Sequence, residues 1–466
     1  MAKIAPIAAM IFSVAVFAFL GGTITAYYQI FPYPYIHDAG RTLWALIETV
    51  SPLRRTYIGE RIETTAFPGS DAANRRWTVY DTSVPRLPVI TFGGLNQYLE
   101  LCPGDGCLAV TVDALGNVTE TWPYRPAEIF AADITDGAFP HEVILFDPRI
   151  SSRPFGIERY ADGDILANFQ ATVSIFPFGL GVARIAQDGT PRWARFDYSH
   201  HWSTLRADGT AYVPSLKIGD GSINVILGTE PSIRRVTINC NRPYHDIIQL
   251  IDVSGGVVDE IELVPLLLKS NWAGIFPETT NFCDPLHLNY IDEISTDAGP
   301  GLSPGDLVVS LRNISAFFIL DPEKRELKRM VSGTFLQQHS VHHLSGSKFL
   351  IFDNHGGDFQ GPASRIVELD LATGMERRIF PNANTPEPFN HVFSGTAGYL
   401  DISPDRSRVL ISVTHAGRVF EVDIASGRLL AVYDNIHDIS SVPDAPEEKR
   451  ALAARFTIYG MSYLSK

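Results

Sequence analysis

Short apolar runs alternate with polar turns along the chain from about residue 88 to its end. Runs at 307–311, 348–353 and 408–413 are each followed by a turn and by a further apolar run that ends in Asp. Runs of about four to eight residues bounded by turns are typical of β-strands. Three consecutive units thus repeat one order: a first strand, a hydrophobic second strand, and a third strand that ends at Asp321, Asp370 or Asp423. A period of about 50 residues built from short strands predicts the blades of a β-propeller.

We therefore predict an all-β fold, a six-bladed β-propeller, for a domain at 61–466. The predicted blades lie at about 88–125, 141–196, 200–264, 284–331, 339–381 and 391–434. Asp-Gly pairs at 162–163, 188–189 and 208–209 mark hairpin turns within them. The terminal run at 455–464 is expected to pair with the first blade and close the ring, because closure removes an exposed strand edge.

The start of the chain has the pattern of a membrane anchor or signal segment, at 1–30. Residues 4–28 carry no Asp, Glu, Lys or Arg, and roughly 20 apolar residues suffice to cross a hydrocarbon core. The apolar stretch of a cleaved signal peptide is shorter, about 7–15 residues, so we favour an uncleaved N-terminal transmembrane helix. The propeller would then be exported. Residues 31–60 are expected to form a juxtamembrane helix, at 38–50, and a linker.

Composition and charge restrict the possible partners. Hydrophobic residues make up 45% of the 466 residues, enough for a large core, and the net charge is −14. An acidic chain is not suited to nucleic acid, whose phosphates require a basic surface, so any site for an anion must be locally basic. The four cysteines suggest disulfides in an exported protein, Cys102 with Cys107 and Cys240 with Cys283. Four free thiols are the alternative.

Polar residues recur at one position of the predicted blades. His287 and His339 lie near the start of a first strand, whereas Asn313, Asn354 and His415 lie at the end of a second strand. These two positions share one face of the ring because neighbouring strands are antiparallel, so the five side chains are expected to meet at one mouth of the channel. Such a group could transfer an anionic group through a nucleophilic histidine, ligate a metal, or tie blades together.

Several short motifs across about 280–425 resemble the aryl sulfotransferase family. They are Asp284-Pro-Leu-His287-Leu-Asn289, Ser310-Leu-Arg312-Asn313, Gln338-His339-Ser340, Phe352-Asp353-Asn354 and Ser364-Arg365-Ile-Val-Glu368. The resemblance implies an exported six-bladed propeller that moves a sulfuryl group from a phenolic sulfate ester to another phenol. It also implies a covalent histidine intermediate and neither a nucleotide sulfate nor any other cofactor or metal.

The resemblance also implies roles for individual residues. His287 and His339 match the family's sulfate-binding histidines, and His339 would also protonate the leaving oxygen and later act as the base. His415 is the best match for the nucleophile, with His391 as the alternative. The residues expected to bind substrate are Asn354, Asn313, Arg365 and Arg312. The implied partners are an aromatic sulfate donor and a phenol acceptor. The N-terminal helix is expected to attach the protein to the inner membrane, and a homodimer is considered beside a monomer. The propeller itself is expected in the periplasm or outside the cell.

One departure from the family pattern concerns a sulfate-binding arginine. The family has an arginine shortly after the Phe-Asp-Asn element, and residues 353–360 contain none. Arg312 or His355 is expected to supply that charge, and Arg365 has an alternative interpretation as part of a salt bridge at the blade edge. A non-catalytic binding propeller is therefore one alternative function, and a metal- or quinone-dependent oxidoreductase is a second. His201 begins a blade in the same manner as His339 and is a further candidate for the mouth of the channel, with a structural role as the alternative. The aromatic candidates for holding a phenol ring, all of which also fit a core role, are Phe92, Trp202, Phe317 and Tyr98.

Overall fold

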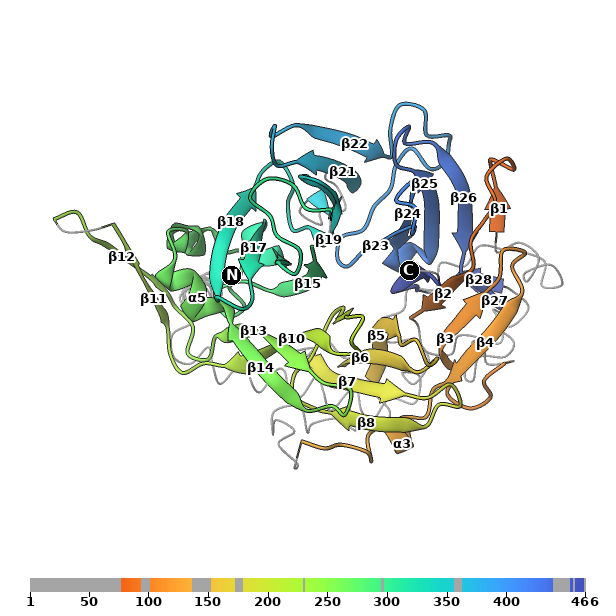
Figure 1. Cartoon of the computed structure of the whole chain (residues 1–466), viewed down its shortest axis with the longest axis horizontal. Helices are drawn as coiled ribbons and strands as arrows, with labels where there is room; N and C mark the ends of the chain where they lie inside the picture. Colours follow the sequence, from red (N-terminus) through yellow and green to blue (C-terminus); the bar gives the residue numbers. More distant parts are fainter. Residues whose placement is uncertain are drawn as a thin grey trace, which may run out of the picture.

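Six antiparallel sheets are arranged around one axis in the computed structural model (Figure 1). The structure describes residues 77–93, 101–135, 152–171, 179–228, 231–294, 297–355, 363–438, 453–455 and 457–464. Each sheet is one blade. Its first strand lies nearest the axis, and the following strands lie successively farther out. The predicted all-β fold with six blades is therefore confirmed. No helix among the described residues is long and apolar enough to cross a membrane, and the predicted anchor and juxtamembrane helix lie outside those residues.

Except for β29 and β1, the strands of the six blades follow one another along the chain. Blade 1 contains β29 (Gly460–Tyr463), β2 (Val89–Phe92), β3 (Cys107–Val112) and β4 (Val118–Pro123). Blade 2 contains β5 (Ser152–Arg159), β6 (Ile165–Ala171), β7 (Gly179–Ile185) and β8 (Pro191–Arg195). Blade 3 contains β9 (Thr204–Leu205), β10 (Ala211–Ile218), β13 (Tyr244–Ile251) and β14 (Val257–Glu262).

The last three blades correspond to the repeated units of the sequence. Blade 4 contains β15 (Leu288–Glu293), β16 (Leu307–Leu311), β17 (Ala316–Asp321) and β18 (Glu326–Ser332). Blade 5 contains β19 (His339–Ser345), β20 (Lys348–Asp353), β21 (Arg365–Asp370) and β22 (Glu376–Phe380). Blade 6 contains β23 (Tyr399–Ile402), β24 (Arg408–Val413), β25 (Arg418–Asp423) and β26 (Leu429–Asp434), with β1 (Trp77–Val79) added at its outer edge.

The remaining elements are short. A hairpin of β11 (Ile223–Leu227) and β12 (Arg234–Ile238) extends from blade 3 away from the ring (Figure 1). Strands β27 (Ile436–Asp438) and β28 (Ala453–Arg455) form a second pair. The helical turns are α3 (Pro126–Ile129), α5 (Leu263–Lys269), η4 (Ala273–Glu278), η5 (Arg312–Ile314) and η7 (Thr414–Ala416).

The C-terminal strand closes the ring, as the sequence predicts. Gly460 of β29 pairs with Phe92 of β2, and Tyr463 pairs with Val89, so the end of the chain supplies the innermost strand of the first blade. Gly93 permits this closure: its φ is +110°, and a Cβ there would lie 2.4 Å from the backbone nitrogen of Tyr459. Closure leaves the inner strands with neighbours on both sides.

The second strands are buried on both faces because each blade packs between two others. All five residues of β16 and all six of β24 are buried. This explains why those segments read as continuous apolar runs rather than as alternating ones, a pattern that strands covered on both faces share. The first strands lie at the axis, where polar side chains can reach the backbone of the next blade. Asn289 of β15, for example, donates to the carbonyl of Gln338 beside β19 at 2.7 Å.

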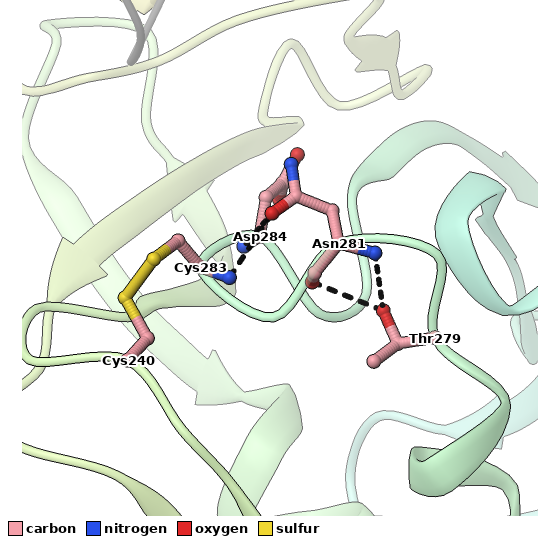
Figure 2. Close-up of a disulfide and its surroundings, with 5 residues drawn as sticks. All are labelled: Cys240, Thr279, Asn281, Cys283 and Asp284. Atoms are coloured by element: carbon pink, nitrogen blue, oxygen red, sulfur yellow. Dashed lines mark hydrogen bonds between the residues drawn. A yellow bond between two sulfur atoms is a disulfide. The ribbon is translucent and has the colours of Figure 1, made fainter. Parts of the chain in front are cut away.

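Two disulfides are present, with the predicted pairing of Cys102 with Cys107 and of Cys240 with Cys283. Figure 2 shows the second bond, which attaches the loop before β15 to the loop before β13. In that loop the Asn281 side chain accepts hydrogen bonds from the backbone nitrogens of Cys283 at 3.0 Å and Asp284 at 3.3 Å. The Asn281 nitrogen in turn donates to the Thr279 hydroxyl at 3.2 Å. The disulfide and these turns fix the position of Asp284.

Candidate functional site

One cavity of about 520 Å³ lies where the starts of the first strands meet. Every blade contributes to its wall a residue from that position, within three residues of the first strand's beginning: Tyr459, Arg153, His201, His287, His339 and Ala397 for blades 1 to 6. The ends of second strands contribute Gln170, Asn313 and His415. The structure thus brings four of the five side chains of the predicted convergence, those of His287, His339, His415 and Asn313, to one cavity. Arg312 joins them there, and Asn354 is not among the lining residues.

The cavity wall contains strained backbone. His201, His287, Gln337 and Ala397 have φ values of 53°, 57°, 51° and 60°, a region that residues with a side chain rarely adopt. All four lie at or just before the first strand of blades 3 to 6. Such strain persists only where the surrounding structure imposes it, and it is concentrated at functional sites.

His287 forms a dyad with Asp284. Its Nδ1 lies in hydrogen-bond contact with an Asp284 carboxylate oxygen, so Nδ1–H donates to the carboxylate and Nε2 is the ring nitrogen left for a ligand. The backbone nitrogen of His287 donates to Asp246 at 3.1 Å. Burial, and the nearby charge of Asp284, raise the pKa of Asp246 well above its ordinary value. Two buried carboxyl groups therefore hold the backbone and the ring of this one histidine.

His339 has its tautomer fixed by Asn354. The Asn354 amide nitrogen donates to the carbonyls of Ser394 at 2.8 Å and Ala397 at 2.7 Å, so its oxygen faces His339 Nδ1 at 2.7 Å. Nδ1 must then carry the proton. Burial, and next the positive charge of Arg312, lower the pKa of His339 to about 3. The ring is neutral at pH 7 and its Nε2 is unprotonated.

Arg312 brings a positive charge to the cavity. It begins η5, directly after β16, and its guanidinium donates to Asn313 Oδ1 at 2.9 Å and to Gln337 Oε1 at 3.1 Å. Asn313 donates in turn to the carbonyl of Asp284 at 2.6 Å. Asn313 therefore positions Arg312 and the loop of Asp284. Burial lowers the pKa of Arg312, which nevertheless starts far above neutral pH and leaves the guanidinium charged.

His415 and His391 occupy different environments. His415, in η7, lines the cavity, and its Nε2 lies 3.0 Å from the Thr396 hydroxyl. His391 is exposed and is not among the residues that line the cavity. Of the two alternatives for the nucleophile, only His415 is placed where it can reach a ligand shared with His287 and His339.

A second pair of histidines adjoins the dyad. His201 lines the cavity, its ring centroid lies 5.1 Å from that of His287, and its Nδ1 lies 2.8 Å from Nδ1 of His200. Only one of these two nitrogens can carry a proton. Burial lowers the pKa of His200 to about 3 and that of His201 well below its ordinary value. A space of about 10 Å³, the size of one water, lies between these rings, His287 and the Asp246 carboxyl.

Some residues that the sequence predicts to bind substrate do not line the cavity. Arg365 begins β21, a third strand, and its guanidinium bonds Asp353 and Glu376, each at 2.8 Å. Third strands lie away from the axis, so the proposed substrate contact of Arg365 has no support here, and a salt-bridge role fits it better. His355 is also outside the cavity, 3.9 Å from Asp353. Asn354 does not line the cavity but contacts the Nδ1 of His339, which does.

The aromatic wall differs from the sequence candidates. Phe155 and Tyr459 line the cavity, with ring centroids 4.5 Å apart. Gly156 makes room for this arrangement, because a Cβ there would lie 2.5 Å from the carbonyl oxygen of His201. Of the four candidates, Phe92, Trp202 and Phe317 are buried in the core outside the cavity wall, and Tyr98 lies outside the described residues.

Several residues of the cavity wall were not predicted from the sequence. Arg153 is the most important, since its guanidinium lies 5.0 Å from the Tyr459 ring. Arg153 could have been found by its position near the start of a first strand. The sequence pattern placed the start of blade 2 at about 141, however, so Arg153 did not fall at that position. Asp284 stands in a quoted motif, yet its contact with His287 depends on the loop conformation.

In the part of the chain that the structure describes, no three His, Cys, Asp or Glu residues are placed to hold a metal.

The buried neutral histidines predict a loss of stability in acid. Unfolded histidine binds a proton near pH 6.5, whereas His200, His201 and His339 resist protonation when folded. Their stabilisation is therefore fully present above pH 6.5 and is lost as the pH falls. Asp246, with its raised pKa, acts in the opposite sense. For a net difference of about two protons, the free energy of unfolding should fall by about 2.7 kcal/mol per pH unit between about pH 6 and 4.

Urea unfolding at several pH values measures this slope. His339→Gln should reduce it by about 1.4 kcal/mol per pH unit, while the exposed control His391→Gln should leave it unchanged. A free energy of unfolding that is flat between these pH values would show that the three rings are not buried as neutral groups.

Comparisons with known proteins give a family match. A family model described as Arylsulfotransferase (ASST) matches residues 160–433. A search of curated proteins finds no match. Among solved structures, a protein of unknown function from Bacteroides caccae is 12% identical over 82% of this chain and 100% of its own, with a TM-score of 0.44. Hydrazine synthase from Kuenenia stuttgartiensis is 13% identical over 75% and 80%, with a TM-score of 0.38. Virginiamycin B lyase from Staphylococcus aureus is 12% identical over 60% and 70%, with a TM-score of 0.34. At these values the structural likenesses carry no argument about function.

Proposed function

The chain belongs to the arylsulfotransferase (ASST) family, and we propose that it transfers a sulfuryl group from a phenolic sulfate ester to an acceptor phenol through a sulfohistidine. One observation carries the proposal: His287, His339 and His415 line a single cavity together with Arg312. The wall holds two arginines and one carboxylate, so the cavity is locally basic in a chain of net charge −14. An anionic sulfate ester fits such a place.

In the first half of the reaction, His415 is the proposed nucleophile. Its Nε2 attacks sulfur, the N–S bond forms, and the bond between sulfur and the aryl oxygen breaks with its electron pair leaving on that oxygen. The leaving phenoxide takes a proton from His287, whose imidazolium form the Asp284 carboxylate stabilises. The phenol then departs and the sulfuryl group remains on His415.

In the second half, the acceptor phenol attacks the same sulfur. Its hydroxyl proton passes to Nε2 of His287, the new S–O bond forms, and the N–S bond breaks to regenerate neutral His415. His287 thus ends each cycle with the proton it gave in the first half, and no other reactant is consumed. The protein mainly positions the reactants and stabilises charge.

His339 has a different role from the acid and base that the family resemblance implies. At pH 7 its neutral ring has no Nε2 proton to give, because burial and Arg312 lower its pKa to about 3. Arg312, which stays charged, would donate to the sulfuryl oxygens, and neutral His339 would lie beside it in the cavity wall.

The two disulfides fit an oxidising compartment, and we place the propeller in the periplasm or outside the cell. Attachment to the inner membrane and a homodimer stay predictions from the sequence.

A chromogenic aryl sulfate tests the proposal directly. With an acceptor phenol present, we expect release of the coloured phenol together with the sulfated acceptor, both seen by absorbance and mass spectrometry. Without acceptor, release should stop after about one equivalent per protein, because the sulfohistidine awaits a phenol.

Other outcomes separate the alternatives. Continued release without acceptor would indicate a hydrolase. No release from protein with an intact fold would favour a non-catalytic binding propeller. Metal or quinone that copurifies with the protein would favour an oxidoreductase.

A further inference from the structure

Arg153 is a charged group that the proposed reaction does not use. It lies near the start of β5 in blade 2 and lines the cavity. Its Nε and Nη1 are buried and have no hydrogen-bond partner among the described residues. Its guanidinium lies over the face of the Tyr459 ring, 5.0 Å from the ring centroid. Buried donors are nearly always paired, and an unpaired one carries a desolvation cost, so this guanidinium is suited to a ligand that supplies acceptors.

Arg153 and Arg312 serve different parts of the cavity. Arg312 is held by Asn313 and Gln337 in blades 4 and 5, and its charge acts on His339. Blade 2 stands three blades from blade 5 in a ring of six, so β5 and β19 lie on opposite sides of the axis (Figure 1). Arg153 therefore lies across the cavity from the imidazole of His339.

The wall beside Arg153 fits an aromatic ring. Phe155 and Tyr459 line the cavity there, and their ring centroids lie 4.5 Å apart. A cavity of about 150 Å³ accommodates benzene, and this one measures about 520 Å³. A phenyl ring against these side chains leaves room for a sulfuryl group on the side of His339 and for a second substituent on the side of Arg153.

We propose that the substrates of this cavity are phenols, and their sulfate esters, that carry a carboxylate at the end of the ring remote from the reacting oxygen, and that Arg153 binds this carboxylate. The planar guanidinium matches a carboxylate in geometry and charge. The inference rests on the proposed sulfuryl transfer and specifies its substrate class. Selection would arise because a neutral phenol leaves Nε and Nη1 of Arg153 without an acceptor, as they are among the described residues of the free protein.

Two acceptors that differ in one charge test this inference: 4-hydroxyphenylacetate and its methyl ester. With a common aryl sulfate donor, kcat/KM should favour the carboxylate by about 10- to 100-fold, the range expected for a hydrogen bond to a charged group. Arg153→Gln should reduce this ratio to about 1, and Arg153→Lys should restore part of it. The control Arg235→Gln, on the exposed hairpin strand β12, should keep the wild-type ratio.

The results separate this inference from the proposed function. Transfer to both acceptors at equal kcat/KM overturns the carboxylate site and leaves sulfuryl transfer standing. An equal loss for both acceptors in Arg153→Gln also overturns it, because Arg153 would then hold the sulfuryl group. If no acceptor is sulfated, the proposed function fails, and calorimetric binding of 4-hydroxyphenylacetate decides the site: loss of binding in Arg153→Gln supports it, and equal binding overturns it.

Discussion

Replacement of His415 by Gln should lower sulfuryl transfer by at least about 1,000-fold, because no other group would form the covalent intermediate. Gln keeps a polar side chain of similar size but lacks a nucleophilic ring nitrogen. His415 is less buried than His339, whose lowered pKa makes its nitrogen a weak base and a weak nucleophile. The measurement is the initial rate with a chromogenic aryl sulfate and an acceptor phenol.

The control is the same change at His391, the alternative from the sequence. His391 is exposed and outside the cavity wall, so His391→Gln should retain the wild-type rate. Mass spectrometry of protein quenched after reaction with donor alone should find one SO3 group on a peptide that contains His415. A sulfuryl group on His339 or His391 instead, or transfer by His415→Gln near the wild-type rate, would contradict the assignment.

The convergence of the histidines followed from the strand pattern alone. Blades 4 to 6 repeat one order of strands, and antiparallel pairing puts the start of the first strand beside the end of the second. His287, His339 and His415 occupy these positions, so their meeting at one face needed no coordinates. The closing strand could be predicted for a similar reason, since a ring of sheets leaves an unpaired edge unless the two ends of the chain meet.

Other features depend on information that a strand pattern does not contain. Arg365 matched a motif, but the register that pairs it with Asp353 turns it toward a carboxylate and away from the axis. Arg153 was missed because the sequence pattern placed the start of blade 2 at about 141, whereas β5 begins at Ser152. The fixed tautomer of His339 requires knowing where both ends of the Asn354 amide point. Such contacts depend on loop conformation and side-chain direction. The periodicity of apolar residues predicts neither of them.

Asp284 is expected to act through His287 as a positioning residue, and Asp284→Asn should lower kcat by about 100- to 10,000-fold, the contribution of a well-placed acid and base. The amide can still meet the ring, but it does not stabilise the imidazolium that gives a proton to the leaving phenoxide. The pH above which kcat falls should move to lower pH, whereas KM for the aryl sulfate should change less than kcat. The pH–rate profile with a chromogenic donor measures both.

Stability distinguishes this effect from misfolding. Asp284 and Asp246 are both buried, and the charge of Asp284 contributes to the raised pKa of Asp246, so the amide relieves a like-charge repulsion. Thermal unfolding of Asp284→Asn at pH 7 should therefore occur at or above the wild-type temperature, even though activity is lost. Asp292→Asn serves as the matched control, because it removes a carboxylate 3.8 Å from His342, outside the cavity wall, and should retain most of kcat. An Asp284→Asn protein that keeps both its rate and its pH profile would remove His287 from the proton transfer, since the partner that orients its ring would then be dispensable.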